Sequence, residues 1–352
     1  MRSLYIMGMS GSGKTALALG LALKLREEGF RVSYFKPTGA PPIPARHRGE
    51  SAVLMREVLN MNQCLEDITP LTAGPLYLSS LHQVADRLER VKEAFNQVAS
   101  EADVVLVGGS AAPFITMAIG TDDITLAKEF GSGVVFTSQI ENDYSLDQTL
   151  AFNQLLAARG VEVLGTVFNL VPRQLLSKAE GIYRPVMERM GYRVLGIVPE
   201  RPEVTSPTVG EIGEALGAEV LVGGDGMGRV VEDLVIGAMT LESALRYFRR
   251  APNKAVITGG DRSDIAMAAL ETNTSVLILT GGLYPDVSVL TRAEEKRVPV
   301  FLVYQDTYST IEQLRDVRRR IHPGDEAAIN MAKCEVEEHL DWRAIVNWVG
   351  GK

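Results

Sequence analysis

Residues 5–25 read YIMGMSGSGKTALALGLALKL, and the spacing of Gly8, Gly13, Lys14 and Thr15 within them points to one fold. An apolar run precedes the glycines and a helix-like stretch follows them, which predicts a strand, a tight loop and a helix. Glycines let the backbone approach a phosphate closely, so that N–H groups and the positive end of the helix point at it. The stretch therefore predicts a nucleotide-binding loop made of Gly8, Ser10, Gly11, Ser12, Gly13, Lys14 and Thr15.

Within such a loop, Lys14 is expected to contact the terminal phosphates, and the Thr15 hydroxyl is expected to bind Mg²⁺. The cofactors predicted on this basis are ATP or ADP with magnesium. A loop of this kind can drive phosphoryl transfer or can simply hold a nucleotide. The loop alone does not choose between these roles.

Short runs rich in Val, Ile, Leu and Phe alternate with stretches of helical periodicity, which is typical of parallel strands joined by helices. We expect an α/β fold with a doubly wound, mainly parallel sheet of the P-loop type over residues 1–205. The candidate strands of this domain are residues 4–7, 31–35, 103–107, 133–137, 163–169 and 193–198.

The pattern of apolar runs is interrupted by three prolines, Pro199, Pro202 and Pro207, and a second set of short strands follows. We place a domain boundary there. A second, smaller α/β domain is expected over residues 206–320, and a helical tail over 321–352 is expected to pack on it. The candidate strands of the second domain are residues 219–222, 229–236, 255–257, 275–280 and 299–303. The candidate helices of the second domain are residues 241–249, 263–271 and 285–296.

The composition is that of an ordinary globular protein, with 46% hydrophobic and 23% charged residues among 352. A net charge of −8 argues against nucleic acid or anionic lipid as a partner. The start of the chain lacks a signal-peptide pattern, so a cytoplasmic location is expected. Cys64 and Cys334 are far apart and have no CxxC partner, so we expect two buried thiols and no disulfide.

Four segments resemble the dethiobiotin synthetase family of P-loop enzymes over roughly residues 1–200. They are the loop, FKPTGA at 35–40, DVVLVGG at 103–109 and GTVFNLVP at 165–172. The resemblance implies that Lys36, in the K-P motif, touches phosphate and substrate. It also implies that Asn169 reads the adenine edge.

Two departures from that family concern the groups that support catalysis. Family enzymes carry a glutamate in a V-E-G motif after the third strand, whereas Gly108 stands at that place here. The segment HRGESAVLMRE offers Glu50 and Ser51 where a metal-binding aspartate is expected, and Glu50 is the candidate substitute because a longer carboxylate still reaches an ion. Phosphoryl transfer depends on positioned metal and charge, so these changes are expected to reduce catalysis more than binding.

The second domain contains AVITGGDRSDIAMAAL and VLILTGGLYPD, in which glycine pairs follow two strands. Such pairs can line one crevice at the carboxyl edge of a sheet. The candidate ligand site is Gly259, Gly260, Asp261, Arg262, Ser263, Asp264, Thr280, Gly281 and Gly282. Arg262 and Asp264 either bind a polar ligand or pair with each other, and pairing is slightly favoured.

These segments resemble the DRTGG domain over about residues 206–320, although GGDRSD and LTGG carry the elements of its name separately. A dethiobiotin synthetase-like module followed by a DRTGG domain is similar to the N-terminal regulatory part of long bacterial phosphate acetyltransferases. The catalytic domain of those enzymes is not expected in this chain.

The resemblance implies an ATP-binding regulatory or sensor protein with weak or no turnover. We expect it to bind a small metabolite at the second domain, to form a homo-oligomer and to act on a partner enzyme. The alternative is an ATP-dependent ligase of the dethiobiotin synthetase type, in which Lys14, Lys36 and Glu50 transfer the terminal phosphate to a carboxylate or amine substrate. Gly108, in place of a glutamate, favours the sensor.

Overall fold

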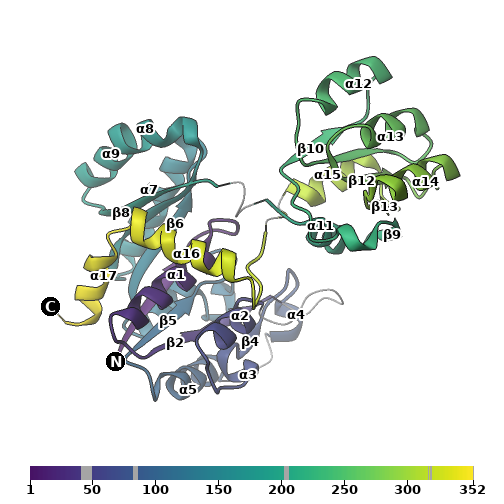
Figure 1. The fold of residues 1–352 in the computed structure, drawn as a ribbon. Coiled ribbons are helices and arrows are strands. Elements are labelled where there is room, and N and C mark those ends of the chain that lie inside the picture. Colours follow the sequence, from purple (N-terminus) through teal and green to yellow (C-terminus); the bar gives the residue numbers. More distant parts are fainter. Residues whose placement is uncertain (41–49, 82–85, 202–205, 316, 318, 352) are drawn as a thin grey trace. The chain divides into compact units, whose positions relative to one another are not determined.

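A computed structural model describes residues 1–40, 50–81, 86–201, 206–315, 317 and 319–351. The chain divides into two compact units, residues 1–200 with 321–352 and residues 201–320 (Figure 1). The second unit is thus inserted between two parts of the first. The proline-rich boundary predicted near residue 202 falls partly on residues 202–205, which lie outside the described residues.

The first unit is built on a six-stranded parallel sheet in the order β2-β5-β1-β6-β7-β8. All six strands predicted for this domain are present, because continuous apolar runs suit strands that are buried on both faces. The strands are β1 (Arg2–Met7), β2 (Val32–Phe35), β5 (Val104–Gly108), β6 (Gly133–Gln139), β7 (Val163–Val171) and β8 (Val194–Pro199). A separate parallel pair joins β3 (Thr38–Gly39) to β4 (Leu71–Thr72).

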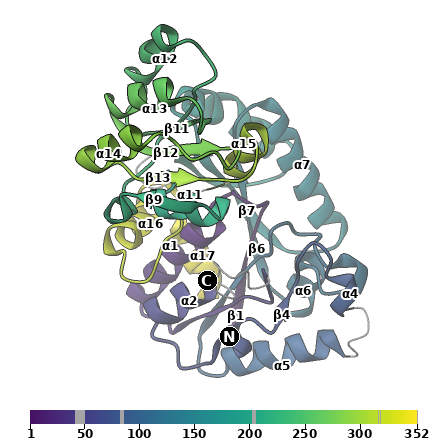
Figure 2. The ribbon, with the colours of Figure 1, turned by 90° about the vertical axis from the view of Figure 1, so that its right-hand side faces the viewer.

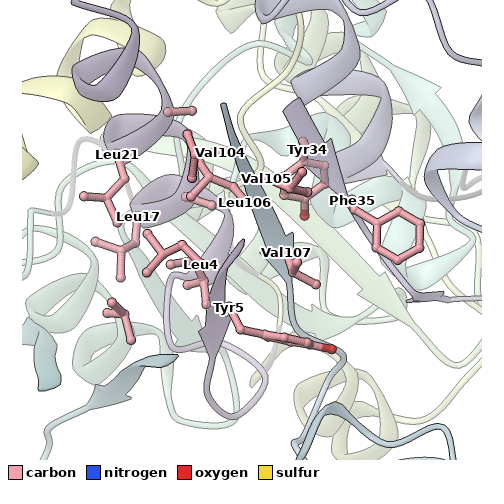
Figure 3. Packing of buried hydrophobic residues seen from close by; sticks show 14 of the residues in the cluster. Leu4, Tyr5, Leu17, Leu21, Tyr34, Phe35, Val104, Val105, Leu106 and Val107 are labelled. Atoms are coloured by element: carbon pink, nitrogen blue, oxygen red, sulfur yellow. The ribbon is translucent and has the colours of Figure 1, made fainter. Parts of the chain in front are cut away.

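Helices connect these strands and bury their apolar sides in a shared core. The longer ones are α1 (Lys14–Glu27), α2 (Glu50–Val58), α5 (Arg87–Ala99), α6 (Asp123–Glu129) and α7 (Asp143–Ala158). The shorter ones are α3 (Leu65–Ile68), α4 (Leu78–Leu81), α8 (Leu176–Lys178) and α9 (Arg184–Arg189). Figure 3 shows part of this core, where Tyr5 of β1 and Tyr34 of β2 lie among Val104–Val107 of β5.

The C-terminal segment corrects the sequence-based expectation, because it packs on the first unit and not on the second. Helix α16 (Glu326–His339) lies along α1, as Figure 1 shows, and α17 (Trp342–Val349) follows it. Gly20 leaves no side chain between the helices, so the Ala332 backbone approaches α1 closely. Lys24 Nζ also lies 3.1 Å from the Glu337 carboxylate. Helical periodicity identifies apolar faces, so it does not show that a glycine such as Gly20 allows another helix to pack closely.

The second unit contains a five-stranded sheet in the order β10-β11-β12-β13-β9, with β9 antiparallel to β13. Its strands are β9 (Glu219–Val222), β10 (Asp233–Ile236), β11 (Lys254–Gly259), β12 (Thr274–Thr280) and β13 (Val300–Leu302). Its helices are α11 (Val209–Leu216), α12 (Leu241–Phe248), α13 (Ser263–Leu270), α14 (Val287–Lys296) and α15 (Thr307–Arg315), and Figure 2 shows them around the strands.

Alternate residues of the central strands face two different cores. Val256 and Leu277 pack with helices α12, α13 and α14, whereas Ile257 and Ile278 pack with α11 and α15. This two-sided burial confirms the predicted fold class, a doubly wound sheet followed by a second, smaller α/β domain. In the described part of the chain, no helix is both long and apolar enough to cross a membrane. Both cysteines are exposed, so the expectation of buried thiols is wrong.

Candidate nucleotide site

The loop between β1 and α1 has the backbone of a phosphate cradle. Gly11 and Gly13 adopt φ values of +78° and +79°, which L-residues with side chains rarely adopt. A Cβ at Gly8 would collide with the Thr137 carbonyl oxygen of β6, so only glycine permits this close approach. No side chain caps α1, and its first turn has no acidic residue, which leaves a helix end suited to an anion.

Lys14 begins α1 and folds back over its own loop. Its ammonium group donates to the carbonyl oxygens of Gly8, at 2.8 Å, and Met9, at 2.7 Å. Burial, with a smaller contribution from the charge of Lys36, lowers the pKa of Lys14 to about 7. A bound phosphate would place a negative charge beside this ammonium group and so favour its charged form.

The other loop residues are distributed between solvent and interior. Ser10 and Gly11 are exposed, whereas Ser12 is buried. Among the described residues, the Ser12 hydroxyl has no hydrogen-bond partner, which is costly unless a ligand or water completes it. Thr15 lies in the first turn of α1 and is partly exposed. The hydroxyl groups of Ser10, Ser12 and Thr15 therefore differ in exposure: Ser10 is exposed, Thr15 is partly exposed and Ser12 is buried.

Asn169, the residue predicted to read an adenine, lies in β7 and contacts the loop directly. Its Nδ2 donates to the Ser12 carbonyl oxygen at 2.8 Å, and the Thr137 hydroxyl donates to the same oxygen at 3.0 Å. A side chain on Gly13 would collide with this Asn169 amide. The amide keeps a second N–H and an oxygen for other partners. Asn169 thus holds the loop in shape, whatever else it recognises.

Lys36 follows β2, and its ammonium group donates to the Gly109 carbonyl oxygen after β5. Burial lowers the pKa of Lys36, and the nearby charge of Asp123 opposes that shift. The charge of Lys36 in turn contributes to the lowered pKa of Lys14. The sheet therefore brings both predicted lysines to one edge, where the carboxyl ends of parallel strands meet.

Asp123 is the main residue of this site that the sequence reasoning missed. It is 1% exposed and accepts hydrogen bonds from the Tyr5 hydroxyl at 2.9 Å and the Ser110 backbone N–H at 2.8 Å. Burial raises its pKa to about 6, although Lys36 and these donors oppose the rise. The pair Asp122-Asp123, at the start of α6, was the available signal, but such pairs usually serve as helix caps.

Gly108, where the related enzymes carry a glutamate, is closely covered by Tyr34. Tyr34 pairs with Leu106 across the β2–β5 ladder, so its phenol extends along β5 over Gly108. A Cβ on Gly108 would collide with the Tyr34 hydroxyl and would lie 2.7 Å from Cζ of the ring. Burial raises the pKa of Tyr34 to about 12, so this hydroxyl stays protonated. An acidic side chain cannot stand at position 108 while Tyr34 holds this place.

Glu50 opens α2, immediately before Ser51, whose hydroxyl lies 3.5 Å from the Tyr34 hydroxyl. Residues 47–49 of the quoted segment HRGESAVLMRE lie outside the described residues. The described residues contain no cluster of three or more His, Cys, Asp or Glu that could hold a metal ion.

The predicted site of the second unit gathers at the carboxyl ends of β11 and β12. Arg262 and Asp264 form a two-point ion pair, at 3.0 and 3.1 Å, as the favoured interpretation expected. Ser263 donates to Asp286 at 2.6 Å, and Thr280 lies 2.9 Å from Thr307. Of the remaining predicted residues, Gly259 ends β11, Gly260 and Asp261 form the turn after it, and Gly281 and Gly282 form the turn after β12.

Gly260 lets these two turns approach each other, because a Cβ there would collide with the Leu283 carbonyl oxygen. Arg262 also donates to the Met239 carbonyl oxygen at 3.2 Å. The polar side chains of Arg262, Ser263 and Asp264 are thus already paired, partly with each other and partly with neighbouring residues outside the predicted cluster.

Comparison with known proteins agrees with this two-part architecture. Residues 2–208 match the family described as AAA domain, and residues 211–317 match the DRTGG domain. The phosphate acetyltransferase of Pseudomonas putida is 28% identical, over 94% of this chain and 49% of the relative. That of Nitratidesulfovibrio vulgaris is 26% identical, over 96% of this chain and 50% of the relative. The chain spans about half the length of the curated relatives it matches.

Among solved structures, the septum site-determining protein MinD of Pyrococcus horikoshii, complexed with Mg-ADP, covers 58% of this chain. The alignment includes 83% of MinD at 16% identity, with a TM-score of 0.36. The predicted order of a P-loop domain, a DRTGG domain and similarity to phosphate acetyltransferases is confirmed by the family matches and the curated relatives. This chain belongs to the AAA domain family through residues 2–208 and carries a DRTGG domain behind that match.

Proposed function

We propose that the first unit is a nucleotide sensor that holds ATP or ADP with magnesium and turns it over slowly or not at all. The observation that carries this proposal is the Tyr34 hydroxyl, which fills the space that a side chain at Gly108 would need. A site with a phosphate loop and two lysines can bind a nucleotide. Without a carboxylate at position 108, it lacks one group that positions metal and charge for transfer.

The residues present fit a magnesium nucleotide. The loop closes tightly at Gly8, the Ser12 hydroxyl is buried without a partner among the described residues, and α1 offers an uncapped end. In this proposal Lys14 and Lys36 bind phosphate oxygens, Thr15 and Glu50 hold the ion, and Asn169 supports the loop and the base. The ion supplies neutralisation of the phosphate charges when it is bound.

The second unit is proposed to take a small polar metabolite at the carboxyl edge of its sheet. Because Arg262 and Asp264 are paired with each other, the ligand would meet the turns at Gly260 and Gly281 mainly through backbone groups. The similarity to phosphate acetyltransferases supports a role in regulating acetyl or phosphoryl metabolism, with a partner enzyme and a homo-oligomer as proposed assemblies.

Calorimetric titration of MgATP and MgADP, combined with a prolonged phosphate-release assay, tests the sensor proposal. Wild type is compared with Lys14→Ala and with Lys128→Ala, an exposed lysine near the end of α6. We expect binding without sustained release in wild type and in Lys128→Ala, and loss of binding in Lys14→Ala. Sustained release that disappears in Lys14→Ala would show turnover at the phosphate loop and overturn the sensor, and the substrate of the ligase alternative would then be sought.

The same titration separates the two units. Nucleotide that binds to Lys14→Ala as tightly as to wild type would occupy a site away from the phosphate loop. If Lys14→Ala binds no nucleotide, the metabolite of the second unit belongs to another chemical class. Sedimentation of the full chain with and without MgATP tests whether nucleotide changes the oligomer.

A further inference from the structure

Asp123 is buried at the start of α6, where β1 and the residue after β5 contribute polar groups to it. Its Oδ1 accepts from Tyr5 of β1, and its Oδ2 accepts from the backbone N–H and the hydroxyl of Ser110 after β5. The Tyr5 hydroxyl and the Ser110 N–H are the main donors toward the carboxyl, because the single proton of the Ser110 hydroxyl is shared with the closer Ala112 carbonyl oxygen, at 2.7 Å against 3.1 Å. Hydrogen bonds donated to a carboxylate favour its ionised form, so the geometry is built for a negative charge.

The charge of Asp123 has one main counterpart, the ammonium group of Lys36. Lys36 donates to the Gly109 carbonyl oxygen, and Oδ2 of Asp123 lies 2.9 Å from the place of a Cβ on Gly109. The ammonium group and the carboxylate therefore contact two consecutive residues after β5, Gly109 and Ser110. Asp123 is the group whose charge opposes the lowering of the Lys36 pKa by burial, and Lys36 is the strongest influence that lowers the pKa of Asp123.

The other titratable groups near this pair do not replace Asp123. Lys14 is a second cation, so it works against the charge of Lys36. Tyr5 and Tyr34 both have raised pKa values, because burial and the charge of Asp123 disfavour their ionised forms. Asp122 caps α6 through Thr125 and influences Tyr5. Among the described residues, Asp123 is thus the anion that supports two partly buried lysines.

We propose that Asp123 is a positioning residue of the phosphate site, whose carboxylate keeps Lys36 charged and in place and so maintains anion binding at and above neutral pH. The part of this inference that concerns anion binding rests on the proposed nucleotide function. The coupling between the charges of Asp123 and Lys36 does not depend on that function. Asp123 is buried, so it acts through Lys36 and not by contact with the nucleotide. A carboxylate from α6 would then provide part of the charge that is missing at Gly108.

A purely structural role is the competing explanation, because Asp123 also ties Ser110 to Tyr5. Asp123→Asn tests the difference, since an amide of the same size keeps one acceptor and removes the charge. Asp122→Asn is the matched control: it makes the same chemical change one residue away, and asparagine still caps a helix. Both variants are made in the full chain.

The first measurement needs no nucleotide. NMR titration of ¹³C-labelled lysines, with the Lys36 signal assigned from Lys36→Met, gives the pKa of Lys36 directly. We expect Asp123→Asn to lower it by about one unit or more, the usual effect of a neighbouring opposite charge, and Asp122→Asn to leave it unchanged. An unchanged Lys36 pKa in Asp123→Asn would overturn the inference, whether or not the protein binds nucleotide.

The second measurement uses MgATP affinity between pH 6 and 8.5. We expect Asp123→Asn to bind nearly as well as wild type at pH 6 and about tenfold more weakly at pH 8. The loss should largely disappear when the change is made in Lys36→Met, because the effect runs through that lysine. A structural role predicts a loss that is independent of pH and persists in Lys36→Met.

Two further outcomes are distinguishable. If wild type does not bind MgATP, the nucleotide function fails, while the Lys36 titration still decides the charge coupling. If Asp123→Asn does not fold, the reciprocal experiment decides: Lys36→Met should raise the pKa of Asp123, read from its labelled carboxyl carbon. An unchanged Asp123 pKa in Lys36→Met would then reject the pairing.

Discussion

The Tyr34 hydroxyl lies where the side chain of residue 108 would begin. These two positions, on neighbouring strands, therefore cannot both carry large side chains. The glycine at 108 therefore does more than leave the site without a carboxylate: it also makes room for Tyr34. It is the small partner of a tyrosine that is buried and stays protonated. A change at one position should depend on the residue at the other.

Gly108→Ala should lower the free energy of unfolding by about 1–3 kcal/mol, because the added methyl group overlaps the Tyr34 ring. Urea unfolding measures this loss. Its cost should be clearly smaller in Tyr34→Ala, where the ring is absent. Gly181→Ala, an exposed glycine with open space around it, is the control and should cost little. Equal costs with and without Tyr34 would refute the coupling.

Asn169→Ala should weaken binding of both MgATP and inorganic tripolyphosphate by about fivefold. The reason is the lost hydrogen bond to the Ser12 carbonyl oxygen, which contributes about 1 kcal/mol to the shape of the loop. Calorimetry with the two ligands measures it.

The tripolyphosphate result separates two roles of Asn169. If Asn169 only read the base, binding of tripolyphosphate, which has no base, would not change. Asn153→Ala is the matched control, since its amide bonds Thr149 and Thr166 inside the same unit. That variant should lose stability and keep its affinity.

Gly20→Ala should destabilise the first unit by about 2 kcal/mol, because its Cβ would collide with the Ala332 carbonyl oxygen of α16. Helix propensity alone predicts a gain of about 1 kcal/mol for this change, so the sign of the result is decisive. Thermal unfolding checks it. Glu337→Gln, which removes the ion pair with Lys24 between the same helices, should cost less than about 1 kcal/mol.

Lys254 gives the second unit a pH-dependent stability. It is fully buried, its ammonium group donates to the Asn273 carbonyl oxygen at 2.7 Å, and burial lowers its pKa to about 8. The unfolded chain binds the proton of this lysine more tightly, so the contribution of Lys254 to stability rises between about pH 8 and 10.5. Lys254→Met should remove that rise in urea unfolding followed across this range.

The control for this prediction is Lys296→Met, which removes an exposed lysine that pairs with Glu271. That variant should keep the slope of wild type between pH 8 and 10.5. A slope that persists in Lys254→Met would show that other groups cause it.

Much of the fold followed from local patterns in the sequence. The six strands of the first sheet are recognisable as apolar runs because both of their faces are buried, and β11, β12 and β13 of the second unit show the same pattern. The phosphate loop was equally readable, because the φ values of Gly11 and Gly13 require the residue type itself. Local chemistry also indicated the Arg262–Asp264 pair, two residues apart.

The structure decided what depends on contacts between distant segments. The tail packs on α1 because Gly20 is small, a fact visible only once α16 is placed beside it. Asp123 joins Lys36 and Tyr5 because separate strands end at one edge of the sheet.

The sequence by itself determined that the chain has a phosphate loop in an α/β fold and that glycine stands at position 108. Only the tertiary structure decided that Tyr34 fills the space beside that glycine and that Asp123 supplies the buried carboxylate nearby. The physical reason is that backbone preference and hydrophobic periodicity act within a segment. Steric exclusion and charge pairing act between segments that only folding brings together.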